Sequence, residues 1–371
     1  MLRDQSRRRP TLLLLTGALA LAPLASVAAG TGSAAAAHKP HTATTVTTAT
    51  TCATTPLGAA TPFNVFVTGD ASLQGSDSQG ALAVGGAATL RDYSVGATLP
   101  NSNGTRDVLI VGGALTFTNG SVQNGNAVSG GKGTLTNVTF PQGGSAQQGS
   151  VLNFGIAATQ LASLSAYYAT LTPNGTTSVQ NGSVTLSGSN ATLNVFTVTG
   201  AAVTGARSVT INAPASSTVL VNIDGATGGF TTASFTLNGV DASHVLYNFP
   251  QASALTLQHV AIQGSILAPS AAIDFTAGVI NGTLVGASLN GGGQSNAGQA
   301  NSGQANSGQA NSGQANSGQA NAGQSNTQPF TGCLPAPTQS GSGSGPAPQQ
   351  CKPGYGYGDK NHCHSGPPGQ H

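Results

Sequence analysis

The stretches "IQGSILAP" (262–269) and "INGTLVGA" (280–287) have nearly the same pattern of residues, 18 positions apart. Two further pairs behave alike: "AVGGA" (83–87) returns as "IVGGA" (110–114), and "VLVNI" (219–223) returns as "VLYNF" (245–249). Self-similarity at offsets of roughly 20 to 50 residues is typical of repeat architectures. We therefore expect the segment 57–290 to consist of stacked structural repeats.

Within this segment, short bursts of sequence alternate polar and apolar residues. A triplet of Thr, an apolar residue and a polar residue recurs with its apolar member at positions 117, 135, 186, 198, 211, 237 and 257. A period of two is typical of a strand that buries one side chain and exposes the next. These strands are too short and too often broken by Gly for helical repeats, so they predict a right-handed β-solenoid of roughly ten coils. An antiparallel β-sandwich is the alternative, but its strands rarely repeat phrases.

The solenoid prediction makes the opening pair two equivalent strands on neighbouring coils. Their aliphatic side chains should then stack inside the axial core, and their glycines should stack where the wall leaves no room for a side chain. The expected stacks are Ile262 on Ile280, Ile266 on Leu284, and Gly264 on Gly282.

One stretch, "NFGIAATQLASLSAYYATLTPNG" (153–175), departs from the strand pattern. Its apolar residues fall near helical spacing, and "PNG" ends the run. We predict one amphipathic helix of about four turns that lies against a face of the solenoid. The apolar residues assigned to this helix are Ile156, Leu161, Leu164, Tyr168 and Leu171.

The segments outside the body have simpler compositions. Residues 1–29 carry the basic start, apolar stretch and small-residue cleavage site of a signal peptide, and the apolar run is short for a membrane anchor. No second apolar run is long enough to span a membrane, so the mature chain is expected to be secreted, with no membrane span. Residues 30–56 are predicted to be an Ala/Thr-rich stalk, and 291–327, with seven GQANS-like pentapeptides, a polar linker. Residues 334–350 form a second linker, and 351–371 a Cys- and His-containing tail.

The chain has four cysteines: Cys52, Cys333, Cys351 and Cys363. An even number in an exported chain favours disulfides. Cys52 and Cys333 flank the body, whereas the other two lie together in the tail. Local pairing therefore predicts Cys52–Cys333 and Cys351–Cys363, although four cysteines allow three connectivities.

Charge is scarce: only 5% of residues are charged, and Glu is absent. Between 57 and 290, four basic residues face seven Asp, a balance of 4 − 7 = −3. This balance and the few aromatic residues argue against nucleic-acid binding. The Asp residues are scattered, whereas lyases and hydrolases need clustered carboxylates. We therefore expect no enzymatic activity and no cofactor, and keep a carbohydrate-active β-helix enzyme as a remote alternative.

Five segments, taken in their order along the chain, carry a resemblance to a known family: "NVFVTGDASLQGSDSQGALAVGGAATLRDYSVG" (64–96), "VLIVGGAL" (108–115), "LASLSAYYATL" (161–171), "VLYNFPQASALTLQHVAIQGSILAPS" (245–270) and "QPFTGC" (328–333). Together they resemble the choice-of-anchor A domain of bacterial surface proteins. The resemblance implies an ice-binding-like β-solenoid over 57–290 with one helix, a closing segment at 328–333, and a cell-surface, adhesive role. It implies no catalytic residues. "LPAPT" (334–338) differs from the wall-sorting pentapeptide that such proteins often carry.

Two groups of residues are candidate sites. Thr116 and Thr118 recur 18 residues later as Thr134 and Thr136, so these four side chains could form a ladder on an outward face. Ice binding, which needs a regular Thr array, is thus an alternative function, although the other Thr triplets are unevenly spaced.

The second group lies in the tail. The side chains of Asp359, His362 and His364 suit zinc or copper. Their spacing is unusual for zinc and Cys363 stands between the two histidines, so a small disulfide-closed motif is the other interpretation.

These observations predict a secreted or cell-surface adhesive or structural protein without enzymatic activity. Outward rows of Thr, Ser, Asn and Gln on a rigid solenoid would bind a surface ligand through many weak contacts. The expected partner is a glycan, a matrix protein or a cell-wall component.

Overall fold

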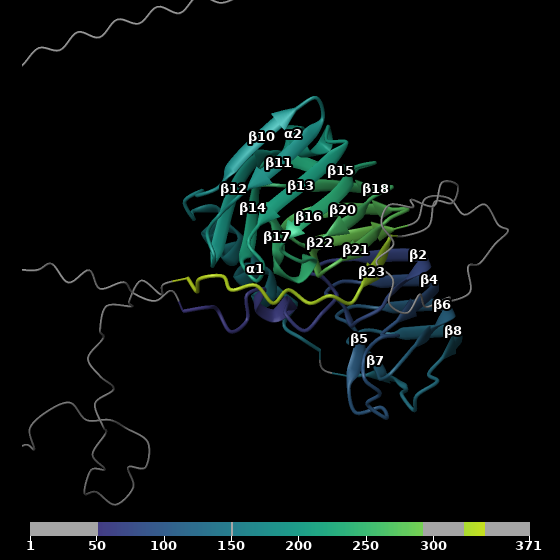
Figure 1. Cartoon of the computed structure of the whole chain (residues 1–371). Helices are drawn as coiled ribbons and strands as arrows, with labels where there is room; N and C mark the ends of the chain where they lie inside the picture. The colour runs from purple at the N-terminus through teal and green to yellow at the C-terminus, as the bar shows by residue number, and fades with distance from the viewer. Residues whose placement is uncertain (1–50, 150, 292–322, 338–371) are drawn as a thin grey trace, which may run out of the picture. The chain divides into compact units, whose positions relative to one another are not determined.

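The chain forms a parallel β-solenoid with three faces (Figure 1), in a computed structural model that describes residues 51–149, 151–291 and 323–337. Each coil passes through the faces in the same order, and we name them face A, face B and face C. The predicted signal peptide, the tail, and most of the stalk and the pentapeptide array lie outside the described residues. Within the described ranges, no helix is long and apolar enough to cross a membrane.

Face A is a stack of ten parallel strands, which agrees with the predicted number of coils. Its strands, in spatial order, are β12 (Leu193–Thr199), β14 (Thr218–Asp224), β17 (Val245–Asn248), the first part of β20 (Ser265–Thr276), the first part of β22 (Leu284–Gly291), β1 (Val65–Val67), β3 (Leu82–Val84), β5 (Asp107–Val111), β7 (Asn126–Ser129) and β9 (Ala146–Gln148).

Face B follows face A along each coil. It consists of β15 (Thr227–Thr231), β18 (Ala254–Gln258), the second parts of β20 and β22, and the first parts of β2 (Ala71–Ser78), β4 (Ala88–Val95), β6 (Leu115–Val122) and β8 (Gly133–Thr139). In the coil that begins with β12, the short helix α2 (Gly200–Thr204) takes the place of a face-B strand and contacts β15. This helix was not predicted, because five residues are too few to show a helical period.

Face C completes each coil. One part is a four-stranded sheet of β10 (Thr176–Gln180), β11 (Ser183–Ser187), β13 (Ser208–Ala213) and β16 (Ser234–Gly239), in which only β10 is antiparallel. Next to β16 lies the other part, with β19 (Ala261–Gln263), β21 (Val279–Asn281), β23 (Gln324–Asn326) and the second parts of β2, β4, β6 and β8. Because β23 belongs to this sheet, the ordered fold includes residues that the sequence assigned to the end of the linker.

The order of coils in space differs from their order along the chain (Figure 1). The chain enters the stack in its middle at β1 and builds coils outward to β9. It continues through helix α1 (Phe154–Ala169) to the opposite end, and the coils from β12 to β22 then stack back toward β1. The two sets meet where Leu284 pairs with Val65 and Leu289 pairs with Ala71. We call this pairing of β22 and β23 with β1 and β2 the seam.

The repeated phrases at 262–269 and 280–287 stack as predicted. Ile262 pairs with Ile280 and Ile266 pairs with Leu284, and all four side chains are fully buried in the axial core. "AVGGA" and "IVGGA" are likewise in register on β3 and β5, and "VLVNI" and "VLYNF" on β14 and β17. The sequence repeat is therefore a signal of the scaffold.

Helix α1 covers the outer side of face A and has the predicted length of about four turns. Leu161 and Tyr168 are buried there against apolar residues of the face-A strands. The prediction for Ile156 was wrong, since 57% of this side chain is exposed. The buried stripe begins instead at Phe154 and continues through Ala157, which turns Ile156 away from the solenoid.

The two ends of the described chain meet beside this helix. Cys52 and Cys333 form a disulfide, as the spacing of the cysteines predicted. Two short 3₁₀ helices, η1 (Gly58–Ala60) and η2 (Ala242–His244), lie in connecting segments. Cys351 and Cys363 lie outside the described residues.

Candidate binding faces

Among the described residues, faces B and C carry most of the side-chain rows that are open to solvent; on face A the short end strand β9 is exposed as well. The outer side chains of face A, such as Phe66, Leu220 and Leu267, are buried in a second apolar layer under α1 and the chain ends. A strand face that is covered on both sides contributes to stability and has no surface left for a ligand. The part of face A under α1 and the chain ends therefore offers no binding surface, and the long rows of outward side chains lie on faces B and C.

The predicted ladder lies on face B. Thr116 pairs with Thr134 and Thr118 pairs with Thr136, while Phe117 between them is fully buried. Two earlier coils extend the rows in the same register. We call the result the face-B ladder; its columns are Ser72, Thr89, Thr116 and Thr134, and Gln74, Arg91, Thr118 and Thr136.

A row of polar corner residues fixes one edge of this ladder. Asp92, Asn119 and Asn137 all have φ near +50°, a conformation that Asn and Asp tolerate better than most residues. The Asn119 side-chain amide donates to the Asp92 carboxylate at 3.1 Å, and the Asn137 amide donates to the Asn119 oxygen at 3.1 Å. Since the corners are bonded from coil to coil, the rows beside them are held in place before any ligand arrives.

A second regular array occupies the four-stranded part of face C. In register on β11, β13 and β16 are three columns, which we call the face-C array: Ser183, Ser208 and Ser234; Thr185, Thr210 and Thr236; and Ser187, Asn212 and Asn238. The outer columns are bonded internally, for example from Asn238 Nδ2 to Asn212 Oδ1 at 2.8 Å. No side-chain hydrogen bond joins the Thr column to other described residues.

This Thr column corrects an expectation from the sequence, which treated the remaining Thr triplets as unevenly spaced. The offsets are 25 residues from Thr185 to Thr210 and 26 from Thr210 to Thr236. The extra residue is taken up between strands, so the strands themselves stay in register. The 26-residue offset of "VLVNI" and "VLYNF" was the signal that could have found it.

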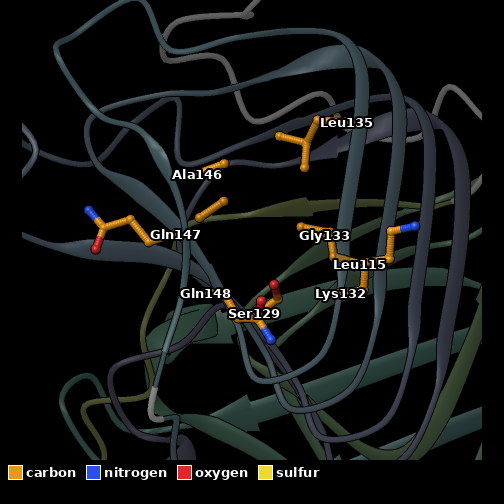
Figure 2. A pocket seen from close by; sticks show the side chains of 9 residues that line it. Leu115, Ser129, Lys132, Gly133, Leu135, Ala146, Gln147 and Gln148 are labelled. Carbon is orange, nitrogen blue, oxygen red and sulfur yellow. The ribbon is translucent and has the colours of Figure 1, made fainter.

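A hollow of about 190 Å³ lies at the end of the axial core, between the residues of the last two coils (Figure 2). The side chains of Leu115 and Leu135 form its apolar part, and Ser129, Lys132 and Gln148 its polar part. The lining includes no carboxylate and no histidine, so this hollow has no pair of groups for acid–base catalysis.

The titratable groups of the described chain are mostly isolated. His244 contacts Asp241 at 2.9 Å, and hydrogen bonds from Ser243 and His244 hold the pKa of the Asp241 carboxyl below its usual range. On face C, burial raises the pKa of Asp77 to about 6. His259 has a φ of 49° at a corner between faces B and C.

No group of three His, Cys, Asp or Glu side chains that could hold a metal ion occurs among the described residues. The candidate ligands Asp359, His362 and His364 lie outside them, so a metal site in the tail stays a prediction.

A family model described as "Putative Ice-binding-like adhesive domain" matches residues 56–297, and a model of pentapeptide repeats matches residues 291–328. Among solved structures, the chain is similar to an ice-binding protein from the Antarctic ascomycete Antarctomyces psychrotrophicus, with 20% identity, a TM-score of 0.30, and coverage of 49% of this chain and 88% of that one. It is also similar to an ice-binding protein from an Antarctic bacterium, Flavobacteriaceae, with 15% identity, a TM-score of 0.27, and coverage of 61% and 74%. No curated protein matches the sequence.

Proposed function

Since residues 56–297 make this chain a member of the family of ice-binding-like adhesive domains, we propose that it is a secreted or cell-surface protein that adheres to an extended ligand through the face-B ladder. Export by residues 1–29 and a place among choice-of-anchor A surface proteins are parts of this proposal. The ligand class is a polymer rich in hydroxyl or amide groups, such as a glycan, a cell-wall component or a matrix protein.

The observation that carries the proposal is the register of the face-B ladder. Coils stack about 4.8 Å apart, so Ser72, Thr89, Thr116 and Thr134 present hydroxyls at a constant interval. Each hydrogen bond to a ligand contributes only about 0.5–1.5 kcal/mol. A rigid row of such groups binds a repetitive ligand by repetition, because little side-chain entropy is lost on contact.

The test uses the full chain and three named probes: insoluble chitin, peptidoglycan and collagen. Thr116→Lys combined with Thr134→Lys places two bulky charges on the last two rungs of the ladder, on β6 and β8, and both sites are exposed, so the fold should persist. We expect binding to at least one probe, weakened tenfold or more by the double variant.

The matched control is Gln160→Lys on the exposed side of α1, which adds the same kind of charge away from faces B and C. This variant should bind as the original chain does. Failure to bind all three probes, or equal binding by the ladder variant and the control, would contradict the proposal.

Ice binding is the second candidate, and a different observation favours it. The Thr185, Thr210 and Thr236 column repeats one side chain on three successive coils, which is the regularity that an ice surface requires. A thermal hysteresis and ice-shaping measurement tests it, with Thr210→Lys as the variant that should abolish the effect. Absence of both effects at high protein concentration would remove this candidate and leave adhesion untouched.

A further inference from the structure

The segments that lead into and out of the solenoid meet at one point. Cys52 and Cys333 are 281 positions apart in sequence, yet their Cα atoms lie 4.9 Å apart and a disulfide joins them. Beyond the disulfide the two segments pair as an antiparallel bridge between Cys52 and Pro335, and the Ala53 amide donates to the Leu334 carbonyl at 2.8 Å. We call residues 52–57 and 330–337 together the strap.

The strap is anchored to the solenoid by both polar and apolar contacts. The Tyr168 hydroxyl of α1 donates to the Pro56 carbonyl at 2.7 Å, and the Tyr167 hydroxyl donates to the Ala336 carbonyl at 3.1 Å. Leu57 and Leu334 are fully buried in the layer outside face A. The strap is therefore an integral part of the fold and does not depend on the disulfide alone.

The split order of the coils gives the strap a mechanical importance. Once the contacts of the strap are pulled apart, tension on residue 52 acts on β1 and tension on residue 333 acts on β23; both strands lie at the seam in the middle of the stack. Without a connection between the two segments, opposed tension would separate the coils at the seam, where Val65 pairs with Leu284 and Ser78 pairs with Ser325. With the disulfide closed, the same tension passes directly from Cys52 to Cys333.

We propose that the Cys52–Cys333 disulfide and the strap form a force clamp that shields the solenoid from tension between the N-terminal and C-terminal segments. With the clamp closed, tension between the two segments passes through the disulfide and not through the coils. Faces B and C therefore keep their structure whichever ligand they bind. The clamp follows from the connectivity of the chain and would act in the same way with either candidate ligand.

Single-molecule pulling of the full chain by its two ends tests the clamp. The oxidised chain should show no unfolding step from the enclosed residues. The double variant Cys52→Ser/Cys333→Ser should show unfolding steps that add up to about 100 nm. This is the extended length of the 281 positions between the two residues, at roughly 3.6 Å per residue. A thermal melt beforehand shows whether this variant is folded.

The control variant Cys351→Ser/Cys363→Ser keeps the clamp and should behave as the oxidised chain does. If the Cys52→Ser/Cys333→Ser variant fails to fold, adding a reductant to the control variant once it is mounted opens the clamp in a chain that is already folded. Two results overturn the proposal. One is long unfolding steps in the oxidised chain. The other is no gain in length after the disulfide has been opened, when the chain is pulled up to the highest force that its attachments withstand.

Discussion

At the scale of single residues, Gly282 stands where one coil passes closest to the next. A Cβ placed on it would collide with the backbone carbonyl of Gly264, which occupies the same position on the preceding coil. We expect Gly282→Ala to lower the free energy of unfolding by about 2–4 kcal/mol, because the backbone at Gly264 and Ser265 must shift. Urea unfolding of the full chain measures this cost.

Gly133→Ala is the matched control for Gly282→Ala. A Cβ at Gly133 would lie 3.4 Å from Ser129 Oγ and 3.6 Å from Leu135 Cδ1, which is ordinary contact. Its effect should stay within about 0.5 kcal/mol. Equal costs at the two glycines would show that the coils are not tightly stacked at Gly264.

Asp77 should make stability depend on pH. Burial raises its pKa from 3.8 to about 6 in the folded chain, so folding disfavours the ionised carboxyl. Its contribution is therefore most favourable below about pH 4 and is lost as the pH rises from about 4 to about 6. The loss is about 1–3 kcal/mol, after allowance for the partial exposure of the side chain.

Asp77→Asn, which resembles the protonated acid, should remove this loss. We expect the variant and the original chain to have similar free energies of unfolding at pH 4, and the variant to be the more stable at pH 7. A difference between the two chains that does not change from pH 4 to pH 7 would contradict the assignment.

At the scale of elements, the repeated Asn of "VLVNI" and "VLYNF" fastens helix α1 to face A. Asn222 and Asn248 are in register and buried; the Asn248 amide donates to the Asn222 oxygen at 2.8 Å and to the Ser165 carbonyl at 2.9 Å. The Asn222 amide in turn donates to the Tyr168 carbonyl at 3.0 Å. These buried bonds join the C-terminal half of α1 to two neighbouring coils of face A.

Asn248→Ala should lower the free energy of unfolding by about 2–4 kcal/mol, because it removes the buried partner of the Ser165 hydroxyl and of the Asn222 side-chain oxygen. Asn238→Ala is the control, since Asn238 makes a comparable bond on the exposed face-C array. That change should cost less than about 1 kcal/mol. Chemical denaturation compares the two, and similar costs would refute a locking role for the buried pair.

The sequence predicted the strands and α1 because their signals are local. A period of two or of 3.6 residues is visible within one element, and stacked coils repeat phrases at nearly constant offsets. Three features were nevertheless missed. The apolar stripe of α1 begins at Phe154 rather than at Ile156, and α2 is too short to show a period. The Thr185, Thr210 and Thr236 column has offsets of 25 and 26 residues, because the turns differ in length, so that only the 26-residue phrase pair pointed to it.

At the scale of the whole molecule, the seam could not be predicted from repeats. Leu284 and Val65 pair although they are 284 − 65 = 219 positions apart, and no shared phrase marks the two strands. A buried polar residue holds the seam together instead. The Asn64 amide donates to the carbonyls of Gly282 and Asn326 at 2.8 and 2.9 Å, and its oxygen accepts from the Gly80 amide at 3.1 Å.

The two ends of the stack differ in how their strand edges are covered. At one end, β10 pairs with the edge of β11, α2 contacts β15, and the Asn174 side chain bonds the backbone of Leu193 and Val195 on β12. At the other end, no described strand pairs with the outer edges of β8 and β9, and the hollow of Figure 2 opens into the core.

In a solenoid each coil is stabilised by its neighbours, so opening should begin where a neighbour is missing. We expect the amides of β8 and β9 to exchange with deuterium at least tenfold faster than those of β11 and β13 at the covered end, in native-state hydrogen exchange of the full chain. The β1 and β22 amides at the seam should be protected like those of interior coils, because Asn64 and the core continue across it. If the seam amides exchanged first, the two sets of coils would open as separate units, and the molecule would behave as two domains joined by the strap.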